Sequence, residues 1–340
     1  MTQAALALKR DQILAFRRRV GALDRRLPAG AGALRAAAWA GLQDSMPRAA
    51  LLSIHARVEG AHPGSWEDDA LVQVWGPRYS AYVVPARDHA YFTLGRYPDD
   101  ERGRRRAEDT AERVRALLEG RRLGHHDLGE GLGVNPNSLK YATTTGTVLI
   151  RWEGARQPTV WTVPRPGIEP FDARLELARR YVHVLGPATP LTFAGWAGIG
   201  EAQGRAAFDA LAGELTPVRT PIGEGWILAS DEAGVREAPI EPAPARLLPS
   251  GDTFYLYWGA NRELLVTDPR RRAELWTSRV WPGAVLVGGD IVGTWRRDGA
   301  NLSVQPWRRL SNGERQAVEA EAAALPLPGI QGAVTVRWDA

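Results

Sequence analysis

Three adjacent polar residues, Gln43, Asp44 and Ser45, interrupt an apolar stretch that runs from residue 36 to residue 60. A glutamine amide can orient a water molecule, and a carboxylate can stabilise positive charge that develops during a reaction. Neighbouring residues on a regular helix point about 100° apart, so Gln43 and Asp44 face one spot only if the local turn is irregular. The alternative is that Asp44 or Ser45 caps a helix that begins at Pro47. A reactive pair and a helix cap are both compatible with the sequence.

The other candidate side chains are not expected to act as nucleophiles, Schiff-base amines or metal ligands. Ser45 has no histidine close in sequence that would activate it as a nucleophile. Lys140 is the one lysine besides Lys9, and on its expected helix a phosphate contact suits it better than a Schiff base. His125 and His126 are adjacent, so their side chains diverge, and we expect a solvated loop there rather than a metal site. The chain has no cysteine, which excludes thiolate chemistry and Cys-ligated zinc, and we expect no metal and no cofactor.

The composition predicts a globular protein of more than one compact unit. The chain has 340 residues, of which 44% are apolar and 24% are charged. No run approaches about 18 uninterrupted apolar residues, and the first residues are too polar after Leu8 for a secretory signal, so we expect a cytoplasmic protein. The net charge of +4 and the pI of about 9.6 are compatible with binding to nucleic acid. An arginine-rich coding bias explains the same charge, because nearly all the basic residues are arginines.

The elements around the polar triplet predict a first helical unit over residues 1–106. Apolar spacing and turn signals place helices and one strand in it. The expected helices cover residues 8–20, 33–43, a segment that starts at Pro47, and 65–71, and the strand covers residues 78–85. The charged run 101–106 is expected to be a turn at the boundary of the unit.

Two further units repeat one order of elements, three helices followed by a hairpin. The second unit, residues 107–168, has helical patterns near 109–118, 125–132 and 135–143, and strand patterns at 148–152 and 159–163. The third unit, residues 169–237, has helical patterns at 175–185, 192–197 and 208–215, and a hairpin at 219–228. This layout is typical of a winged helix. We therefore predict three tandem winged-helix units, the first with a truncated wing near residues 80–84.

The last unit, residues 246–340, is rich in short strands. Patterns of β-branched and aromatic residues predict strands at 254–258, 284–287, 290–297, 302–305 and 333–338. Gly288-Gly289 and Asp298-Gly299 are strong hairpin turns. Helices are expected at 269–276 and from Ser311, where Glu314 completes a capping box. We predict a small, mostly antiparallel barrel or sheet, of which we favour the β-barrel, and an α+β fold class for the whole chain.

Three passages make the chain resemble the winged-helix family that includes the AlkZ and YcaQ bacterial DNA glycosylases. They lie at residues 41–60, at 178–196, and at 291–307 with the helix 310–321 that follows. The resemblance implies that three tandem winged helices form a concave DNA-binding channel beside a C-terminal β-barrel. The expected partner is double-stranded DNA, damaged or intact, in the cytoplasm at the nucleoid, and the lack of an apparent dimerisation or effector element favours a monomer.

The same resemblance bears on the polar triplet. The family's glycosylases share a Gln-apolar-Gln or Gln-apolar-Asp motif, whose three positions fall on Gln43, Asp44 and Ser45. Gln43 matches the motif, whereas Asp44 and Ser45 depart from it. Tyr82 stands where related sequences commonly carry a histidine. The departures put catalysis in question without affecting the expected fold or DNA binding.

Residues that could contact DNA are spread over several elements. On the expected recognition helix, amide and hydroxyl groups could read base edges or touch phosphate. On the expected wing, arginines suit a groove, and Trp152 could wedge or stack between bases. The candidates are Arg48, Arg78, Tyr82, Asn135, Asn137, Ser138, Lys140, Arg151, Trp152, Arg156, Arg296, Arg297 and Arg308.

Two functions follow from these observations. The first is a monofunctional DNA glycosylase that hydrolyses the N-glycosidic bond of alkylated or crosslinked purines, with Gln43, Asp44 and Ser45 as catalytic candidates. Such a base is already a cationic leaving group, so the enzyme must stabilise an oxocarbenium-like sugar and orient one water. The second is a non-catalytic winged-helix protein, a damage binder or regulator, that has lost the motif. The sequence leaves open the lesion and whether a base is flipped.

Overall fold

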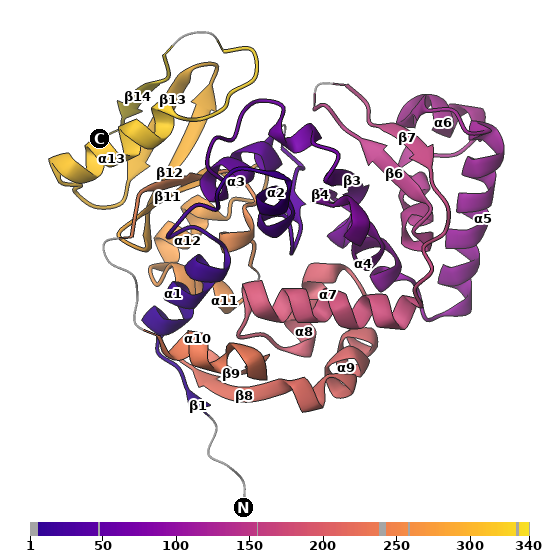
Figure 1. The fold of residues 1–340 in the computed structure, drawn as a ribbon, viewed down its shortest axis with the longest axis horizontal. Coiled ribbons are helices and arrows are strands. Elements are labelled where there is room, and N and C mark those ends of the chain that lie inside the picture. The colour runs from indigo at the N-terminus through magenta and orange to yellow at the C-terminus, as the bar shows by residue number, and fades with distance from the viewer. Residues whose placement is uncertain are drawn as a thin grey trace, which may run out of the picture.

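The fold is a mixture of helices and three sheets, which confirms the predicted α+β class. The computed structural model describes residues 6–46, 48–154, 156–237, 243–257, 259–330 and 333–339. Figure 1 shows most elements of the first unit in the middle of the molecule, between the C-terminal sheet and the second unit, with the third unit below them, while helix α1 (Arg10–Val20) lies at the lower left beside the third unit. No helix in the described part of the chain is both long and apolar enough to cross a membrane.

A six-stranded antiparallel sheet joins the first unit to the second. Its strands, in spatial order, are β2 (Leu42–Gln43), β4 (Ala81–Pro85), β3 (Leu71–Trp75), β6 (Val148–Arg151), β7 (Thr159–Thr162) and β5 (Leu123–Gly124). The link is the pairing of β3 with β6, in which Gln73 lies opposite Ile150. The first unit therefore has a full hairpin, β3–β4, where the sequence predicted a truncated one. Residues 65–71, predicted as a helix, form only a short turn of 3-10 helix before β3.

Helix α1 of the first unit packs against helices of the third and C-terminal units, and the other helices of the first two units lie closer to this sheet. The helices of the first unit are α1 (Arg10–Val20), α2 (Ala31–Ala37), α3 (Ala49–Arg57), η1 (Ser65–Glu67), η2 (Pro77–Tyr79), η3 (Ala86–Asp88), α4 (His89–Thr93) and η4 (Leu94–Arg96). In the second they are α5 (Glu101–Leu118), α6 (His125–Gly131) and the 3-10 helix η5 (Pro136–Thr145). Pro47, expected in the first turn of the second helix, lies outside the described residues.

Two expectations for these helices are wrong. The charged run 101–106 begins α5 instead of forming a turn, because Asp100 caps the helix at Gly103 N and the buried Ala107, Ala111 and Val114 continue one helical face. The helix expected over residues 33–43 ends at Ala37, so the polar triplet begins in β2. This second difference decides which way the triplet's side chains point.

The third unit has the predicted order of three helices and a hairpin, but its third helix, expected over residues 208–215, ends at Ala210. It contains α7 (Pro170–Leu185), α8 (Pro190–Ala197), α9 (Glu201–Ala210), η6 (Ala212–Glu214), β8 (Leu215–Thr220), β9 (Gly223–Leu228), η7 (Ala229–Asp231) and α10 (Glu232–Arg236). Strand β1 (Leu6–Ala7) adds to this hairpin, parallel to β8. Buried Leu177, Tyr181 and Leu185 of α7 pack in the largest apolar core, with Phe193 and Trp196 of α8.

The described residues of the C-terminal unit form an open sheet, so the barrel favoured from the sequence is not observed. The sheet contains β10 (Arg246–Leu248), β11 (Gly283–Val287), β12 (Asp290–Asp298), β13 (Asn301–Pro306) and β14 (Thr335–Trp338), in that spatial order. Helix α13 (Asn312–Ala323) contacts β10, β11 and β14, and its Val318 and Ala322 enter the apolar core of the sheet. Because this helix covers one face, β14 returns parallel to β13, and among the described residues no pairing closes the sheet onto β10.

Shorter helices complete this unit. They are η8 (Thr253–Tyr255), α11 (Asn261–Leu265) and α12 (Pro269–Leu275). The strand expected at 254–258 is absent from its described residues, where η8 stands instead, and Trp258 lies outside them. The capping box at Ser311 is confirmed, since Glu314 N donates to Ser311 Oγ and Ser311 N donates to Glu314 Oε2.

Candidate functional site

The polar triplet has its side chains on two opposite faces of the backbone. Gln43 pairs with Tyr82 of β4, and Asp44 N donates to Ala81 O at 2.8 Å, so the extended pairing continues to Asp44. Side chains alternate along extended backbone. Gln43 and Ser45 therefore share one face, and Gln43 Nε2 donates to Ser45 Oγ at 3.1 Å. Asp44 points the other way and is 1% exposed. The expectation that Gln43 and Asp44 act together on one spot is wrong.

Asp44 acts as a cap for helix α3. Its Oδ1 accepts a hydrogen bond from Ala50 N in the first turn at 3.0 Å, and its Oδ2 accepts one from Gln73 Nε2 at 2.7 Å. The Arg48 guanidinium lies 3.5 Å from the same Oδ2. Burial raises the pKa of Asp44 from 3.8 to about 7, although Ala50, Arg48 and Gln73 favour the ionised form. Asp44 therefore bonds the first turn of α3 as a capping carboxylate would, although Arg48 occupies the N-cap position itself.

The raised pKa gives Asp44 a predictable effect on stability. Between about pH 4 and pH 7 the folded protein binds a proton that the unfolded chain has released, so the free energy of unfolding falls as the pH rises through that window. From pH 5 to pH 8, the titration of Asp44 should lower the free energy of unfolding by about 2–3 kcal/mol. Urea unfolding of wild type and Asp44→Asn at both pH values measures this loss as the difference between the two pH profiles. Asp69→Asn, at an exposed carboxylate, should keep the wild-type profile, and an unchanged profile in Asp44→Asn would contradict the assignment.

Gln73 is a residue of this site that the sequence interpretation missed. It is 4% exposed on β3, between the apolar Val72 and Val74. Its Oε1 accepts from Trp152 N at 2.6 Å, while its Nε2 donates to Asp44. Gln73 therefore ties Asp44 to the backbone that follows β6. A lone amide within an otherwise apolar strand was the signal in the sequence, because a buried amide needs partners.

Two hollows meet at the exposed face of the triplet. The tryptophan hollow is lined by residues that include Gln43, Met46, Arg262, Trp276, Arg279 and Trp281. The basic hollow is lined by residues that include Tyr79, His125, Asn137, Lys140, Trp152 and Arg156. Each has a volume of about 640 Å³, and Ser45 and Arg78 line both. Asp and Glu are absent from the described lining residues of either hollow.

The junction of the hollows contains unusual backbone. Arg78 and Tyr79 have φ of 53° and 58°, a region that side chains other than glycine adopt at a cost of about 1–3 kcal/mol. Gly198, just after α8, permits this turn to approach closely, because a Cβ there would lie 2.9 Å from the Arg78 backbone. Arg78 also donates to Trp196 O at 3.3 Å. The third unit therefore holds Arg78 at the junction.

Several predicted DNA contacts converge on the basic hollow, and others do not. Arg78, Asn137, Lys140, Trp152 and Arg156 line it. Asn135 caps η5 through Asn137 N, and Ser138 Oγ donates to Asn135 O, so both lie at the start of that helix. Burial lowers the pKa of Lys140. Five of the predicted contacts are thus brought together by η5, η2 and the β6–β7 hairpin.

Other predicted contacts are engaged within the protein. The guanidiniums of Arg48 and Arg151 lie 3.8 and 4.6 Å from the centre of the Trp66 ring. Arg48 also donates to Trp152 O, and Arg151 pairs with Glu67 at 2.8 Å. These two arginines hold the β6–β7 hairpin against the first unit.

The remaining predicted contacts lie away from the triplet's exposed face. Tyr82 is 0% exposed, with its ring packed against Gly41 and Gly76, so the prediction that it contacts DNA is wrong. Arg296 and Arg297 line a separate hollow on the C-terminal sheet, and Arg308 pairs with Glu314 at 2.6 Å. The structure does not bring these three arginines to the two hollows around Gln43.

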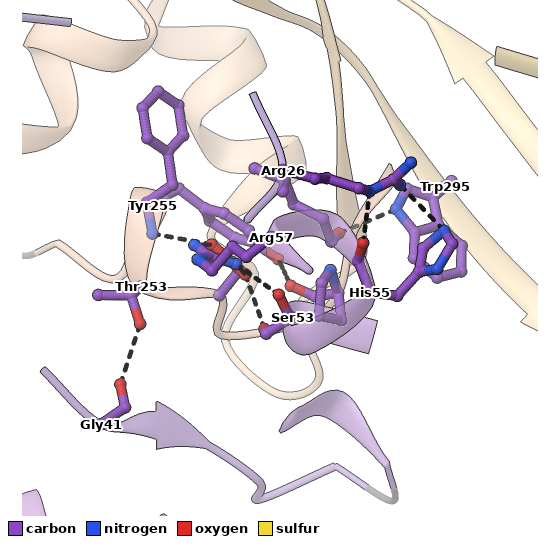
Figure 2. A network of polar contacts seen from close by, with 12 residues as sticks. Arg26, Gly41, Ser53, His55, Arg57, Thr253, Tyr255 and Trp295 are labelled. Atoms are coloured by element: carbon purple, nitrogen blue, oxygen red, sulfur yellow. Dashed lines mark hydrogen bonds and ion pairs between the residues drawn. The ribbon is translucent and has the colours of Figure 1, made fainter. Parts of the chain in front are cut away.

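A buried polar network supports the triplet from behind. Figure 2 shows Arg57 beside Ser53 on helix α3, near the η8 residues Thr253 and Tyr255. Arg57 donates twice to Asp252, at 2.7 Å to each carboxylate oxygen, and Ser53 Oγ donates to Asp252 Oδ2 at 2.7 Å. Thr253 Oγ1 donates to Gly41 O at 3.1 Å, just before β2.

The network fixes one wall around Gln43. Gly251 has φ of +74°, and a Cβ at this position would lie 3.3 Å from Gln43 Cδ. The buried Gln43 Oε1 has no hydrogen-bond partner among the described residues. Leaving a buried acceptor without a hydrogen bond costs about 1–3 kcal/mol. A donor that reaches Gln43 Oε1 removes this cost and therefore binds there favourably.

Comparison with known proteins gives two matches. A family model described as "DNA glycosylase AlkZ-like" matches residues 34–326. The solved structure of Streptomyces sahachiroi DNA glycosylase AlkZ is similar, with a TM-score of 0.77 and 20% sequence identity, over 98% of this chain and 100% of that one. At that identity the structural likeness shows the fold alone. The search of curated proteins found no sequence match.

Proposed function

The chain belongs to the AlkZ-like family of DNA glycosylases, and on that premise we propose that it hydrolyses the N-glycosidic bond of alkylated purines in duplex DNA. The observation that carries the proposal is the position of the half-buried Gln43 and Ser45: Gln43 lines the tryptophan hollow, and Ser45 lines both hollows, whose described lining has no carboxylate. As a repair enzyme it would act as a monomer in the cytoplasm, at the nucleoid, without a cofactor.

We propose that the DNA backbone binds in the basic hollow. Lys140, Arg78 and Arg156 supply positive charge, and the described lining offers no carboxylate that would repel phosphate. Side chains of this kind provide most of the affinity for a duplex. We further propose that residues 1–106, 107–168 and 169–237 correspond to three winged-helix units, with the first boundary shifted to Glu101 because α5 begins there, and that residues 246–340 form a separate C-terminal unit. Their helices followed by hairpins support this division.

The carboxylate-free site limits the substrates in the proposed reaction. Because the described lining has no carboxylic acid to protonate the leaving base, the proposed substrate is a base that is already cationic, as it is after alkylation of a purine ring nitrogen. Gln43 Oε1 is the acceptor that would hold the attacking water, while Nε2 is held by Ser45 Oγ. Asp44 does not take part directly, because its carboxyl faces the interior.

The proposal is tested by incubating the protein with a duplex that contains N7-methylguanine and measuring free base. We expect release from this duplex and none from the unmodified control. Absence of release, with DNA binding retained, would overturn the enzymatic proposal and assign the alternative, a non-catalytic DNA-binding protein. The observation that favours this alternative is Ser45, which stands where the family motif has Gln or Asp. Absence of salt-sensitive DNA binding would contradict both functions.

The DNA-binding face yields a prediction of its own. The double variant Lys140→Ala, Arg156→Ala should weaken binding to any duplex and lower the slope of log affinity against log salt by about 2. The matched variant Arg296→Ala, Arg297→Ala removes two arginines from the separate hollow and should leave the slope unchanged. Fluorescence anisotropy over a salt series measures both. A lowered slope in the matched variant, with none in the first, would place the DNA on the C-terminal sheet.

A further inference from the structure

The tryptophan hollow differs chemically from the basic hollow beside it. It combines the aromatic rings of Trp276 and Trp281 with the guanidiniums of Arg262 and Arg279. Its volume of about 640 Å³ lies within the range of about 300–1,000 Å³ typical of sites that hold small organic ligands. Planar rings next to cationic groups match a nucleotide, which carries a planar base and an anionic phosphate.

The hollow is built from side chains that are already fixed. Trp276 Nε1 donates to Tyr255 O at 3.0 Å, and Arg262 Nε donates to Tyr257 O at 2.7 Å. The Arg262 guanidinium lies 5.0 Å from the centre of the Trp276 ring and 5.3 Å from that of Trp281. A ligand that enters therefore orders few side chains, and less of its binding free energy is lost to ordering.

The tryptophan hollow adjoins the basic hollow, as a site for a nucleotide turned out of a bound duplex must. Ser45 and Arg78 line both hollows, so a backbone seated in the basic hollow runs beside the opening of the tryptophan hollow. A base in the tryptophan hollow then places its bond to the sugar near the junction, where Gln43 and Ser45 lie. The buried Gln43 Oε1, which lacks a partner among the described residues, stands in that wall.

We propose that the tryptophan hollow receives a purine rotated out of the duplex, stacked on Trp281, while the strand backbone stays in the basic hollow. This inference rests on the proposed function, since it assumes that duplex DNA lies across the junction. Rotation leaves a gap in the base stack, and stacking on the indole ring offsets part of the lost base stacking.

Rotation is measured with 2-aminopurine, whose fluorescence rises when a neighbouring base leaves the stack. The probe is a duplex that carries 2-aminopurine next to a 2′-fluoro analogue of N7-methylguanosine, which resists hydrolysis. Wild type should raise the fluorescence on binding. Trp281→Ala should reduce the rise at saturating protein at least about fivefold. Trp281→Phe should restore most of it, because the stacking face is retained.

Two further variants make the test specific. Trp338→Ala removes a tryptophan of β14 that lies outside both hollows, and it should behave as wild type. Ser278→Trp fills the tryptophan hollow from an exposed position and should also suppress the rise, which keeps the test informative if Trp281→Ala does not fold. A full rise in both Trp281→Ala and Ser278→Trp would overturn the inference.

The outcomes separate this inference from the proposed function. A fluorescence rise in wild type without release of N7-methylguanine from a hydrolysable duplex would support base rotation and overturn the enzymatic proposal. Release of the base without any fluorescence rise would support the enzyme and overturn base rotation.

Discussion

Gln43→Ala is expected to slow base release about 10²–10³-fold, the usual effect of removing one polar group aimed at a transition state. DNA affinity should change by less than about threefold, because the charged groups of the basic hollow are untouched. Gln43 holds its amide on the exposed face of the triplet and presents the acceptor assigned to the attacking water. Single-turnover release from an N7-methylguanine duplex, with anisotropy for affinity, measures both quantities.

Two controls sharpen this prediction. Ser45→Ala removes only the acceptor that holds Gln43 Nε2, so a smaller reduction of about tenfold is expected. Gln316→Ala replaces an exposed glutamine of α13 and should leave the rate unchanged. Wild-type rates in Gln43→Ala would show that the reactive site lies elsewhere in the chain.

Asp252→Ala is expected to lower the free energy of unfolding by about 3–5 kcal/mol, because it leaves the buried Arg57 guanidinium without its partner. The side chains of Arg57 and Asp252 are 3% and 0% exposed, and Ser53 and Phe254 also donate to the same carboxylate. The cost is high because an unpaired charge in the interior is not solvated. Urea unfolding of wild type and variant at one pH measures the difference.

The matched control for this variant is Glu101→Ala. Glu101 pairs with Arg105 one turn further along α5, but both side chains are largely exposed, so a loss within about 0.5 kcal/mol is expected. A loss below about 1 kcal/mol in Asp252→Ala would contradict the importance of the network drawn in Figure 2. Base release should also fall in Asp252→Ala, because Asp252 follows the Gly251 wall around Gln43.

The sequence predicted best those elements whose signals are local. The apolar spacing of α7, the turn between β11 and β12, and the capping box at Ser311 are contained within a few residues of chain, and the structure confirms them. The hairpins β6–β7 and β8–β9 were predicted for the same reason. Local hydrogen bonds and side-chain periodicity determine such elements wherever they lie in the fold.

Apart from the start of α5, where the Asp100 cap is a local signal that was overlooked, the elements that were predicted wrongly depend on distant partners. Strand β3 exists because β4 and β6 pair with it on either side. The C-terminal sheet stays open because α13 occupies one face. The patterns of these segments are weak, and tertiary contacts outweigh such weak propensities.

The sequence by itself showed that Gln43, Asp44 and Ser45 are a polar interruption in an apolar stretch. The family resemblance, to which this stretch contributes, is confirmed by the family match. Only the tertiary structure decided what each of them does. Pairing with β4 makes the triplet extended, which turns Asp44 into the interior, where Ala50 N and Gln73 satisfy its carboxylate. The same alternation turns Gln43 toward the tryptophan hollow and leaves Ser45 at the junction of the two hollows. The direction of a side chain on so short a strand is set by its partner strand, and that partner lies about forty residues away in sequence.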